Sequence, residues 1–562
     1  MEGLLLKNIS MGIHMGHDRS VSIVCDGKLI GSLASERIDR IKHSTSSKVP
    51  FETINALLKY LNINIHDIKY VGITYVSVNI EKLSQFYSDQ LHEYYPNWDF
   101  KIIPVSHHLA HAASSYYTSD FKKALVFVAD GGGDLVNDQE ESESIFIATP
   151  NNGLQLLEQR LQSNVIHTLT RTQFHLYPFM NDKYKSMQIS IAKKYEQITY
   201  LLGFSWNQSG KTMGLASYGQ ELFIPQIPAI SNINFDLHAD FIIKEIYQLY
   251  LSSGLSYQTY INQNRAAIAK TLQTFTEELI MSIIGYLIKK YQISQLCLSG
   301  GLFLNCLLNH KILERFPGVS LHVCPAAGDD GQSIGAAFIA YQYFVDNRLK
   351  DRICTLPYLG ISYTNQQIRA SLEQKHLKYQ YFENCNELCK IIADEIYQNK
   401  IIGFFTGRSE VGPRALCHRS ILANATWIGM KDYLNERVKH RENFRPFAPV
   451  VMREFEQEYF ELKQTSPYML LAPKVSPKYA SKIPSVVHVD QTARVQSVEA
   501  KENPFIYQII KDFYELSGVP ILLNTSFNDN GEPIVETPED AINTFLLTKI
   551  DVLVLENFLI YK

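Results

Sequence analysis

Three apolar segments of this chain each run directly into a glycine-rich turn, and this feature constrains the fold more than any other. The segments are residues 124–129, 295–298 and 319–323, and the turns are 130–134, 299–301 and 328–331. Strands that end in such turns before helices are typical of α/β architecture, in which ligands bind at the carboxyl ends of the strands. An alternating pair, 21–25 and 28–34, is joined by Asp26-Gly27 and predicts a hairpin near the start.

The composition is that of an ordinary globular enzyme. The chain has 562 residues, of which 46% are hydrophobic and 20% charged, and its formal net charge is -4. These values exclude disordered, collagen-like and coiled-coil chains, and they argue against a general nucleic-acid or membrane binder. The 8 cysteines form no C-x-x-C pair and the first residues lack a signal-peptide pattern, so we expect a cytoplasmic protein with reduced thiols.

A break in the pattern near residues 345–358 predicts a domain boundary. The segment 346–351 is polar and 356–360 is turn-like, so we expect one domain over 1–345 and a second over 355–562. The second part again alternates, with a helix predicted at 387–399 and strands at 401–405 and 521–523. Residues 224–234 are expected to form a loop.

Two histidines and two aspartates form the first candidate site. His107 and His111 are four residues apart at the start of a predicted helix, so they lie on one face of it. Asp130 follows a buried strand and Asp329 has a comparable position. The histidines alone could equally be a hydrogen-bonded pair, but with the two carboxylates they suit Fe, Mn or Zn at a non-structural site.

The glycine turns and two polar pairs nearby give a second set of candidates. Backbone N–H groups without nearby Cβ atoms let a phosphate approach, and three such turns in one domain suggest a nucleotide held between two lobes. His17-Asp18 and Lys42-His43 lie in or near the first hairpin. Read alone, either pair could belong to the site or be surface charge.

A basic segment in the second half predicts a phosphate pocket. Between Arg408 and Arg453 there are nine Lys or Arg and four acidic residues, an excess of five positive charges in a chain of -4. A solvated helix face is the alternative, but interleaved glycines and prolines favour rigid loops, where Arg makes bidentate contacts to phosphate. Residues 524–528 follow a strand and offer hydroxyl and amide donors.

Taken together, these strings resemble the NodU/CmcH-type O-carbamoyltransferase family, which includes tobramycin and cephem carbamoyltransferases. In the first half the matching strings are GHD at 16–18, ER at 36–37, RIKH at 40–43, HHLAH at 107–111, DGGG at 130–133, GKTMGLA at 210–216, SGG at 299–301 and GDDG at 328–331. In the second half they are GPRAL at 412–416, HRSIL at 418–422, VK at 438–439, FRPFAP at 444–449, Arg494, NTSFN at 524–528 and GEP at 531–533.

The resemblance implies a fold and a two-step reaction. The first domain is expected to be two-lobed, actin-like and sugar-kinase-like (ribonuclease-H-like), and the second to be a YrdC-like α/β domain. The second domain is expected to make carbamoyl-adenylate from carbamoyl phosphate and ATP, with Mg as the ATP counter-ion. The first is expected to transfer the carbamoyl group to a hydroxyl of a small natural product or sugar beside a divalent metal, with Fe favoured over Zn or Mn.

Residue roles follow from the matched positions. The resemblance implies that His107, His111, Asp130 and Asp329 bind the metal, with Asp329 chosen over its neighbour Asp330. His17 and Lys42 are expected near the transfer chemistry, with His17 as the base because an imidazole titrates near neutral pH. The remaining residues are expected to hold carbamoyl phosphate, ATP or the phosphate of AMP: Arg414, Lys439, Arg445, Arg494, Ser526, Asn528, Gly132, Gly300 and Gly301.

Several questions stay open at this stage. The rival readings are a tRNA threonylcarbamoyl-transferring enzyme of the same N-terminal fold and a nucleotide-binding regulator that resembles chaperone ATPases. The acceptor is unidentified, and its specificity is expected in segments such as 177–200. Cys417 stands where the family usually has glycine, which predicts a shift of the loop that carries Arg414. The oligomeric state is open, and a homodimer is one assembly that the sequence allows.

Overall fold

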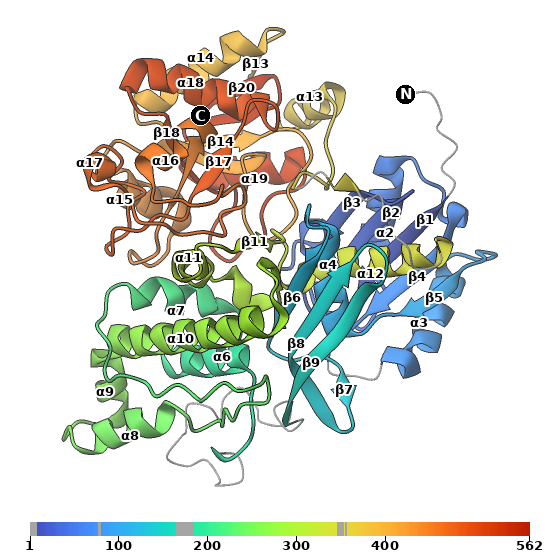
Figure 1. The fold of residues 1–562 in the computed structure, drawn as a ribbon. Helices are drawn as coiled ribbons and strands as arrows, with labels where there is room; N and C mark the ends of the chain where they lie inside the picture. Colours follow the sequence, from blue (N-terminus) through green and yellow to red (C-terminus); the bar gives the residue numbers. More distant parts are fainter. Residues whose placement is uncertain (1–7, 77–79, 164–184, 346–352, 355–356) are drawn as a thin grey trace.

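The structure is a computed structural model that describes residues 8–76, 80–163, 185–345, 353–354 and 357–562. Three β-sheets organise the chain. Two of them lie in the N-terminal half, coloured blue and cyan in Figure 1, and the third carries the orange and red C-terminal part. Helices cover the sheets on both sides, so the chain is α/β throughout, as the glycine-turn pattern predicted.

The first sheet has the order β12-β3-β2-β1-β4-β5. Its strands are β1 (Ile9–His14), β2 (Ser20–Cys25), β3 (Lys28–Ala34), β4 (Ile68–Thr74), β5 (Lys101–Pro104) and β12 (Ile353–Cys354). β1 and β2 are antiparallel, as are β2 and β3, whereas β1, β4 and β5 run parallel. Every residue of β1 is buried, which places this strand at the centre of the sheet with both faces covered.

The second sheet repeats this topology. Its strands are β6 (Ala124–Ala129), β7 (Leu135–Val136), β8 (Gln139–Thr149), β9 (Gly153–Ser163), β10 (Gln295–Ser299) and β11 (Ser320–Val323). The order is β11-β10-β6-β8, and both β7 and β9 pair with β8. β6, β8 and β9 are successively antiparallel, and β6, β10 and β11 are parallel. Two sheets with the same strand order and directions make the two-lobed, ribonuclease-H-like arrangement expected of an actin-like or sugar-kinase-like domain.

Two helices pack against each other between these sheets. α4 (His107–Tyr117) follows β5 of the first sheet, and α12 (Gln332–Tyr341) follows β11 of the second. α12 packs on β1 and β4, whereas α4 packs on β6 and β10, so each helix contacts the other lobe (Figure 1). A Cβ at Gly335 would lie 1.9 Å from the Ala110 carbonyl oxygen, so only glycine permits this close approach. Both helices therefore begin at the same place, between the lobes.

Other helices complete the N-terminal half. They are α1 (Glu36–Asp39), α2 (Phe51–Leu61), α3 (Ile80–Tyr94), α6 (Ile191–Leu201), α7 (Ser209–Ala216), α8 (Ile243–Leu251), α9 (Tyr257–Gln263), α10 (Arg265–Tyr291) and α11 (Cys306–Arg315). α10 contains the apolar run 279–288 and packs against α6, α7, α9 and α11. Among the described residues, no helix is both long and apolar enough to cross a bilayer.

The third sheet has the order β13-β20-β19-β14-β15-β18-β16-β17. Its strands are β13 (Gln380–Tyr381), β14 (Ile402–Phe405), β15 (Arg419–Asn424), β16 (Ala448–Met452), β17 (Gln496–Val498), β18 (Ile521–Ser526), β19 (Val552–Leu555) and β20 (Phe558–Tyr561). The helices of this part are α13 (Asn365–Gln374), α14 (Cys385–Tyr397), α15 (Met430–Leu434), α16 (Glu456–Tyr459), α17 (Pro477–Ala480), α18 (Pro504–Ser517) and α19 (Pro538–Leu547). α14 and α18 pack together over β14, β15, β16 and β18.

The strands and helices predicted from sequence are present. The hairpin corresponds to β2 and β3, the three glycine-turn strands to β6, β10 and β11, and the later predictions to α14, β14 and β18. Residues 224–234 form no helix or strand. The prediction missed β1, whose continuous burial gives no alternation. The proposed boundary falls partly outside the described residues, and the division at 345 and 355 stays a prediction.

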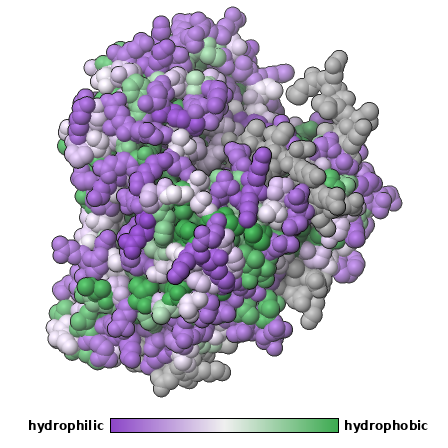
Figure 2. Space-filling view, viewed as in Figure 1, coloured by the Kyte–Doolittle hydropathy of each residue, from purple (hydrophilic) through white to green (hydrophobic). Residues whose placement is uncertain are grey.

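The N- and C-terminal parts share an apolar core and several polar contacts. One buried apolar cluster runs from Leu125 to Ile560 and includes side chains from both parts. The backbone N–H of Leu321 donates to Gln464, which donates back to the Leu321 carbonyl at 2.6 Å. At Gly412, which has φ +90°, a Cβ would lie 2.3 Å from the Pro325 carbonyl oxygen. The outer face seen in Figure 2 is mainly hydrophilic, with smaller apolar areas.

Candidate functional site

A single cavity of about 1070 Å³ lies between the two parts of the chain. The N-terminal part contributes the ends of strands and the starts of helices to one wall, and the C-terminal part contributes loops to the other. His17, Asp130 and Asp329 line the first wall, and Arg414 and Lys439 line the second. Members of the two constellations predicted from sequence therefore line one cavity, while His107 and His111 are fully buried and lie outside its lining.

The first wall holds the two histidines and two aspartates close together. His107 Nε2 lies 3.3 Å from Asp130 Oδ2, and His111 Nε2 lies 3.1 Å from Asp329 Oδ1. One ligand atom from each of the four side chains lies within 4.8 Å of the others. Asp329 belongs to this group. Asp330 does not, and burial together with the negative charges of Asp18 and Glu36 raises its pKa to about 7.

Outer contacts orient both imidazoles toward the carboxylates. His107 Nδ1 lies 2.9 Å from the Tyr75 carbonyl oxygen, which can only accept, so this nitrogen carries a proton. His111 Nδ1 lies 3.3 Å from Ser299 Oγ. In both rings Nε2 is thus left to face Asp130 and Asp329. Metal-binding histidines show this arrangement, with one nitrogen held by an outer partner and the other directed at the ion. The four residues fit a divalent metal.

The electrostatics of this group match the interpretation. Burial acts to lower the pKa of His107, but the carboxylates of Asp329 and Asp130 outweigh burial and raise that pKa to about 10. Burial acts to raise the pKa of Asp130, but hydrogen bonds with His107 and His111 hold it well below its usual range. Protons on the imidazoles therefore balance the carboxylates where a cation would do so.

His17 begins a chain of polar contacts from this group toward the cavity wall. Its Nε2 lies 3.2 Å from Asp329 Oδ2 and its Nδ1 3.0 Å from Asp18 Oδ2, and Asp18 Oδ1 lies 2.8 Å from His43 Nδ1. Burial acts to lower the pKa of His17, but Asp329 and Asp18 raise it to about 9. This pKa is higher than the near-neutral value expected from the sequence, because the two carboxylates stabilise the protonated imidazole. Trp206 packs edge-on against His17, with ring centroids 5.4 Å apart.

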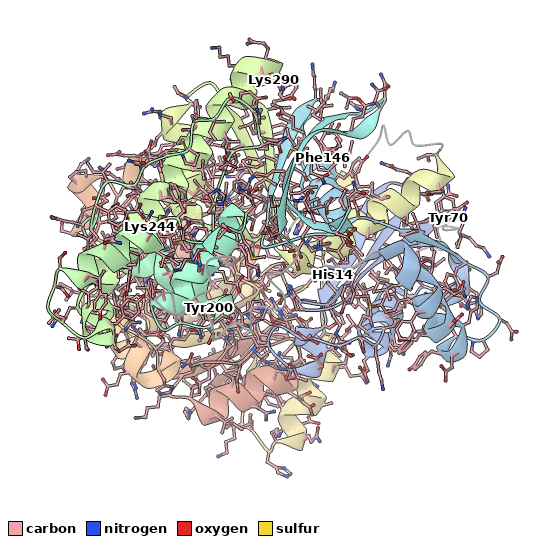
Figure 3. The ribbon with its side chains drawn as sticks, turned by 90° about the horizontal axis from the view of Figure 1, so that it is seen from below. His14, Tyr70, Phe146, Tyr200, Lys244 and Lys290 are labelled. Carbon is pink, nitrogen blue, oxygen red and sulfur yellow. The ribbon has the colours of Figure 1, made fainter. Side chains whose placement is uncertain are left out.

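Two buried side chains near the metal-type group escaped the sequence analysis. His14, at the end of β1, is fully buried, lies 3.7 Å from Asp329 Oδ2, and has no hydrogen-bond partner among the described residues. Figure 3 shows it in the interior, where the lobes meet. Gln332, the first residue of α12, is also fully buried, and its amide nitrogen lies 3.1 Å from His111 Nε2. Gln332 lies three residues after Asp329, about one helical turn away, and this spacing could have indicated from the sequence that the two side chains lie close together.

On the second wall, Lys439 ties together two residues predicted to bind phosphate. Its Nζ donates to the Ser526 carbonyl at 2.9 Å and to the Asn528 side-chain oxygen at 2.7 Å. Ser526 Oγ donates to the same Asn528 oxygen at 2.7 Å. Burial lowers the pKa of Lys439, and the neighbouring Arg441 and Arg445 lower it further. Arg441, which was not among the predicted site residues, also lines the cavity.

The arginines of this wall carry positive charge that the protein does not balance. Among the described residues, no carboxylate lies within ion-pair distance of Arg414, Arg441 or Arg494, whereas Arg445 approaches Glu442 at 3.9 Å. Within the same ranges, the Nε atoms of Arg414 and Arg494 are buried without a hydrogen-bond partner. Burial and the charge of Arg494 lower the pKa of Arg414 to about 9. Such a wall is suited to an anion with several oxygens.

A buried carboxylate fixes the loop that carries Arg414. Glu410 Oε1 accepts from the backbone N–H groups of Leu416, His418 and Arg419 at 2.7, 2.7 and 3.0 Å. Cys417 lies inside this loop with φ 75°, a left-handed conformation that favours glycine. Cys417 Sγ lies 3.2 Å from Asn524 Nδ2, and the shift of the loop relative to a glycine-bearing relative stays a prediction.

The other predicted residues divide into those that line the cavity and those that do not. Lys42, Gly132 and Gly301 line it, together with Arg445, Arg494, Ser526 and Asn528. Burial lowers the pKa of Lys42, and the charges of Arg445 and Arg414 lower it further. Gly300 is not among the lining residues; with φ +98°, it lets the turn after β10 pack on β6, where a Cβ would lie 2.3 Å from the Ala129 carbonyl oxygen. Residues 177–184 of the suggested specificity segment lie outside the described residues.

Comparisons with known proteins cover most of the chain. Residues 99–338 match the family model described as carbamoyltransferase N-terminus, and residues 393–562 match the one described as carbamoyltransferase C-terminus. The chain is 30% identical to an uncharacterized protein of Synechocystis sp., across 97% of this chain and 95% of that protein. It is also 30% identical to nodulation protein NolNO of Sinorhizobium fredii, across 97% of this chain and 79% of that protein.

Two further similarities are weaker or cover less. Nodulation protein NolO of Bradyrhizobium diazoefficiens is 32% identical, across 82% of this chain and 79% of that protein. Among solved structures, full-length HypF in its phosphate- and nucleotide-bound form is 16% identical, with a TM-score of 0.43, covering 61% of this chain and 57% of that chain.

Proposed function

Because the chain belongs to the carbamoyltransferase family, we propose that it is an O-carbamoyltransferase that uses carbamoyl phosphate and ATP in two steps. In the first step carbamoyl phosphate and water give carbamate and phosphate, and carbamate attacks the α-phosphorus of ATP, with loss of pyrophosphate. In the second step the hydroxyl of an acceptor attacks the carbamoyl carbon of carbamoyl-adenylate. The products are a carbamate ester and AMP.

The observation that carries this proposal is that both walls face one cavity. The cation-rich loops and the two aspartates of the His/Asp group, Asp130 and Asp329, line the same space of about 1070 Å³. Carbamoyl-adenylate is a mixed anhydride that water destroys, so an enzyme gains by forming and consuming it within one cavity. A cavity of this size holds a nucleotide and a small acceptor.

The arginines and Lys439 would perform the first step. Arg414, Arg445 and Arg494 would bind the phosphate oxygens of the two substrates, whose negative charges must approach one another for the reaction. Their unbalanced positive charge would stabilise the transition state most, because negative charge builds up there. Lys439 holds Ser526 and Asn528 in place, so both side chains are positioned before substrate binds. Mg is expected to accompany ATP.

The residues around His107 would perform the second step. His107, His111, Asp130 and Asp329 would hold a divalent metal, with iron favoured over zinc or manganese, and the metal would supply Lewis acidity for the carbamoyl carbonyl. His17 would take the proton of the acceptor hydroxyl after its own proton has passed to the Asp18–His43 pair. Asp18 lies 3.0 Å from His17 Nδ1 and 2.8 Å from His43 Nδ1, so it links the two imidazoles. The backbone near Gly132 and Gly301 would contact the phosphate of the departing AMP, and Lys42 would contribute positive charge nearby.

Product analysis tests this proposal directly. The protein should be incubated with ATP, carbamoyl phosphate and a panel of sugar and natural-product alcohols, and the products identified by mass spectrometry. A gain of one carbamoyl group on an alcohol, with pyrophosphate and AMP formed in proportion, is the expected result. Pyrophosphate release that does not require carbamoyl phosphate would contradict the proposed first step.

A further inference from the structure

Glu442 lies between two cations that come from different parts of the chain. Its Oε1 is 2.6 Å from Lys211 Nζ, on α7 of the N-terminal part, and its Oε2 is 3.9 Å from Arg445 Nη1, on the C-terminal wall. Lys211 and Arg445 both line the cavity. Among the described residues, Glu442 is the one carboxylate within ion-pair distance of the arginines that line the C-terminal wall.

Glu442 could bind Arg445 fully without any change of the backbone. The two residues are three positions apart, and the Arg445 N–H donates to the Glu442 carbonyl at 3.1 Å, which closes a turn. Their side chains are 34% and 35% exposed, so rotation of the side chains alone would bring the carboxylate onto the guanidinium. Because carboxylate and phosphate use the same N–H donors of arginine, a carboxylate bound there would compete with a phosphate.

Lys211 is the stronger partner of Glu442 in the structure. The separation of 2.6 Å is that of a charge-assisted hydrogen bond, whereas 3.9 Å to Arg445 is not a hydrogen bond. Burial acts to raise the pKa of Glu442, but the hydrogen bond from Lys211 and, to a smaller extent, the charge of Arg445 hold it below its usual value. The carboxylate is therefore drawn away from the C-terminal wall.

Contacts between the two parts of the chain fix the position of Lys211. Its Nζ lies 5.7 Å from the centroid of the Phe204 ring, and this ring packs against Phe444, with centroids 6.2 Å apart. A Cβ at Gly214 of α7 would lie 3.8 Å from Pro446 Cδ, so the helix packs closely on the loop that carries Arg445. The place of Lys211 beside Glu442 is thus set by more than their own ion pair.

We propose that Lys211 is a positioning residue for the first step, which holds Glu442 away from Arg445 and keeps that guanidinium available to phosphate. This proposal rests on the proposed function, which assigns Arg445 to phosphate binding. It adds that the N-terminal part contributes to a step otherwise performed by the C-terminal wall. Lys211 acts through Glu442, without contact to the substrate.

The test asks whether removal of the Glu442 charge restores what the loss of Lys211 takes away. Lys211→Met, Glu442→Gln and the double variant would be compared in carbamoyl-phosphate-dependent pyrophosphate release at varied ATP concentration. We expect Lys211→Met to raise KM for ATP by about three- to fivefold, the scale of a partly exposed ion pair, with kcat nearly unchanged. The double variant should return KM to the unaltered value, because no carboxylate is left to reach Arg445. Glu442→Gln alone should keep or lower KM.

Three results would overturn the proposal. An unchanged KM in Lys211→Met would show that Glu442 does not compete for Arg445. A double variant as weak as Lys211→Met would show that the ammonium contacts the substrate itself. Lys193→Met is the matched control, because Lys193 also lines the cavity and pairs with Glu196 at 2.7 Å. An equal rise of KM in this control would mean that any lost positive charge has the same effect.

Binding of inorganic pyrophosphate separates this proposal from the proposed function. If the unaltered chain releases no pyrophosphate with ATP and carbamoyl phosphate, the proposed function is wrong. Calorimetric dissociation constants for added pyrophosphate, in the unaltered chain and the three variants, then test Lys211 without turnover. Weaker binding in Lys211→Met that the double variant restores is the expected result, and equal constants in all four chains would contradict the role of Lys211.

Discussion

The two walls of the cavity solve the problem of buried charge in opposite ways. On the N-terminal wall, His107 and His111 face Asp130 and Asp329, so positive and negative groups are paired and all four are buried. On the C-terminal wall, arginines lie beside one another, and each lowers the pKa of its neighbours. The first wall is balanced by protons that a cation can replace, whereas the second is balanced only when an anion binds. One cavity is thus prepared for ligands of both signs.

The largest expected effect comes from a substitution on the C-terminal wall, whose arginines would bind the anionic substrates. Arg414→Ala removes a guanidinium whose charge no described carboxylate balances, so carbamoyl-adenylate formation should fall by about 10²–10³-fold. Pyrophosphate release that depends on carbamoyl phosphate measures this step. Transfer from supplied carbamoyl-adenylate should be nearly unchanged, because Arg414 lies on the wall opposite His107. Equal losses in both assays would mean that the walls do not divide the reaction.

The converse substitution, in the His/Asp group of the N-terminal wall, should weaken metal binding and carbamoyl transfer. His111→Ala removes one of four metal-type ligands, and we expect metal affinity to fall by at least about 100-fold and transfer to fall with it. Adenylate formation should continue, since it uses the other wall. Metal content after dialysis is the measurement, and Ala substitution of His322, a histidine outside the cavity lining, is the control. Full retention of metal would remove His111 from the ligand set.

The protons that balance the first wall predict that its metal affinity depends on pH. His107 has a pKa raised to about 10, so it is protonated at neutral pH and must lose that proton to bind a metal. Metal affinity should therefore rise with pH below 10, by about tenfold per pH unit for each proton released. Titration of the metal at pH 6, 7 and 8 in weak buffer gives both the affinity and the protons released. Affinity that is flat over this range would contradict the charge balance described for the first wall.

How far the sequence predicts each wall depends on the kind of interaction. His107, His111 and Asp130 were identified because helical spacing and a strand end are geometric facts of the chain. Gln332 was missed because a glutamine has no fixed partner type. The local count of basic residues was only partly informative: Arg408 donates to the Ile30 and Gly360 carbonyls, away from the cavity. Charge counting cannot tell which cations are held by backbone carbonyls and which stay available.

The hydrogen bonds that join the two walls could not be predicted from the sequence. Arg40, on the N-terminal side, donates to the carbonyls of Ile534 at 2.7 Å and Pro533 at 3.0 Å. Both carbonyls belong to a loop, 529–534, that lines the cavity. The resemblance marked the RIKH string, but the partners of Arg40 lie nearly 500 residues away, and only the packing of the two parts brings them together.

Loss of this contact should have a moderate effect. Arg40→Ala should weaken the attachment of the 529–534 loop by about 1 kcal/mol, roughly a fivefold change in the equilibrium between attached and detached loop. More carbamoyl-adenylate should then escape to water, so the ratio of AMP formed to acceptor carbamoylated should rise, while the rate of pyrophosphate release stays the same. Arg369→Ala, on α13, is a control with no cavity contact. An unchanged ratio would show that Arg40 does not help to enclose the intermediate.

The smallest expected effect concerns the loop beneath Arg414. Cys417 has φ 75°, a conformation that costs a residue with a Cβ about 1–2 kcal/mol relative to glycine. Cys417→Ala and Cys417→Gly both remove the Sγ contact with Asn524, but only glycine also relieves the backbone. The glycine variant should therefore be more stable than the alanine variant by about 1 kcal/mol, the reverse of the usual order in helices and strands. Denaturant unfolding of the two variants compares them, and a more stable alanine variant would mean that the loop relaxes. Adenylate formation should change little in either variant, because Glu410, which holds three backbone N–H groups of the loop, is kept in both.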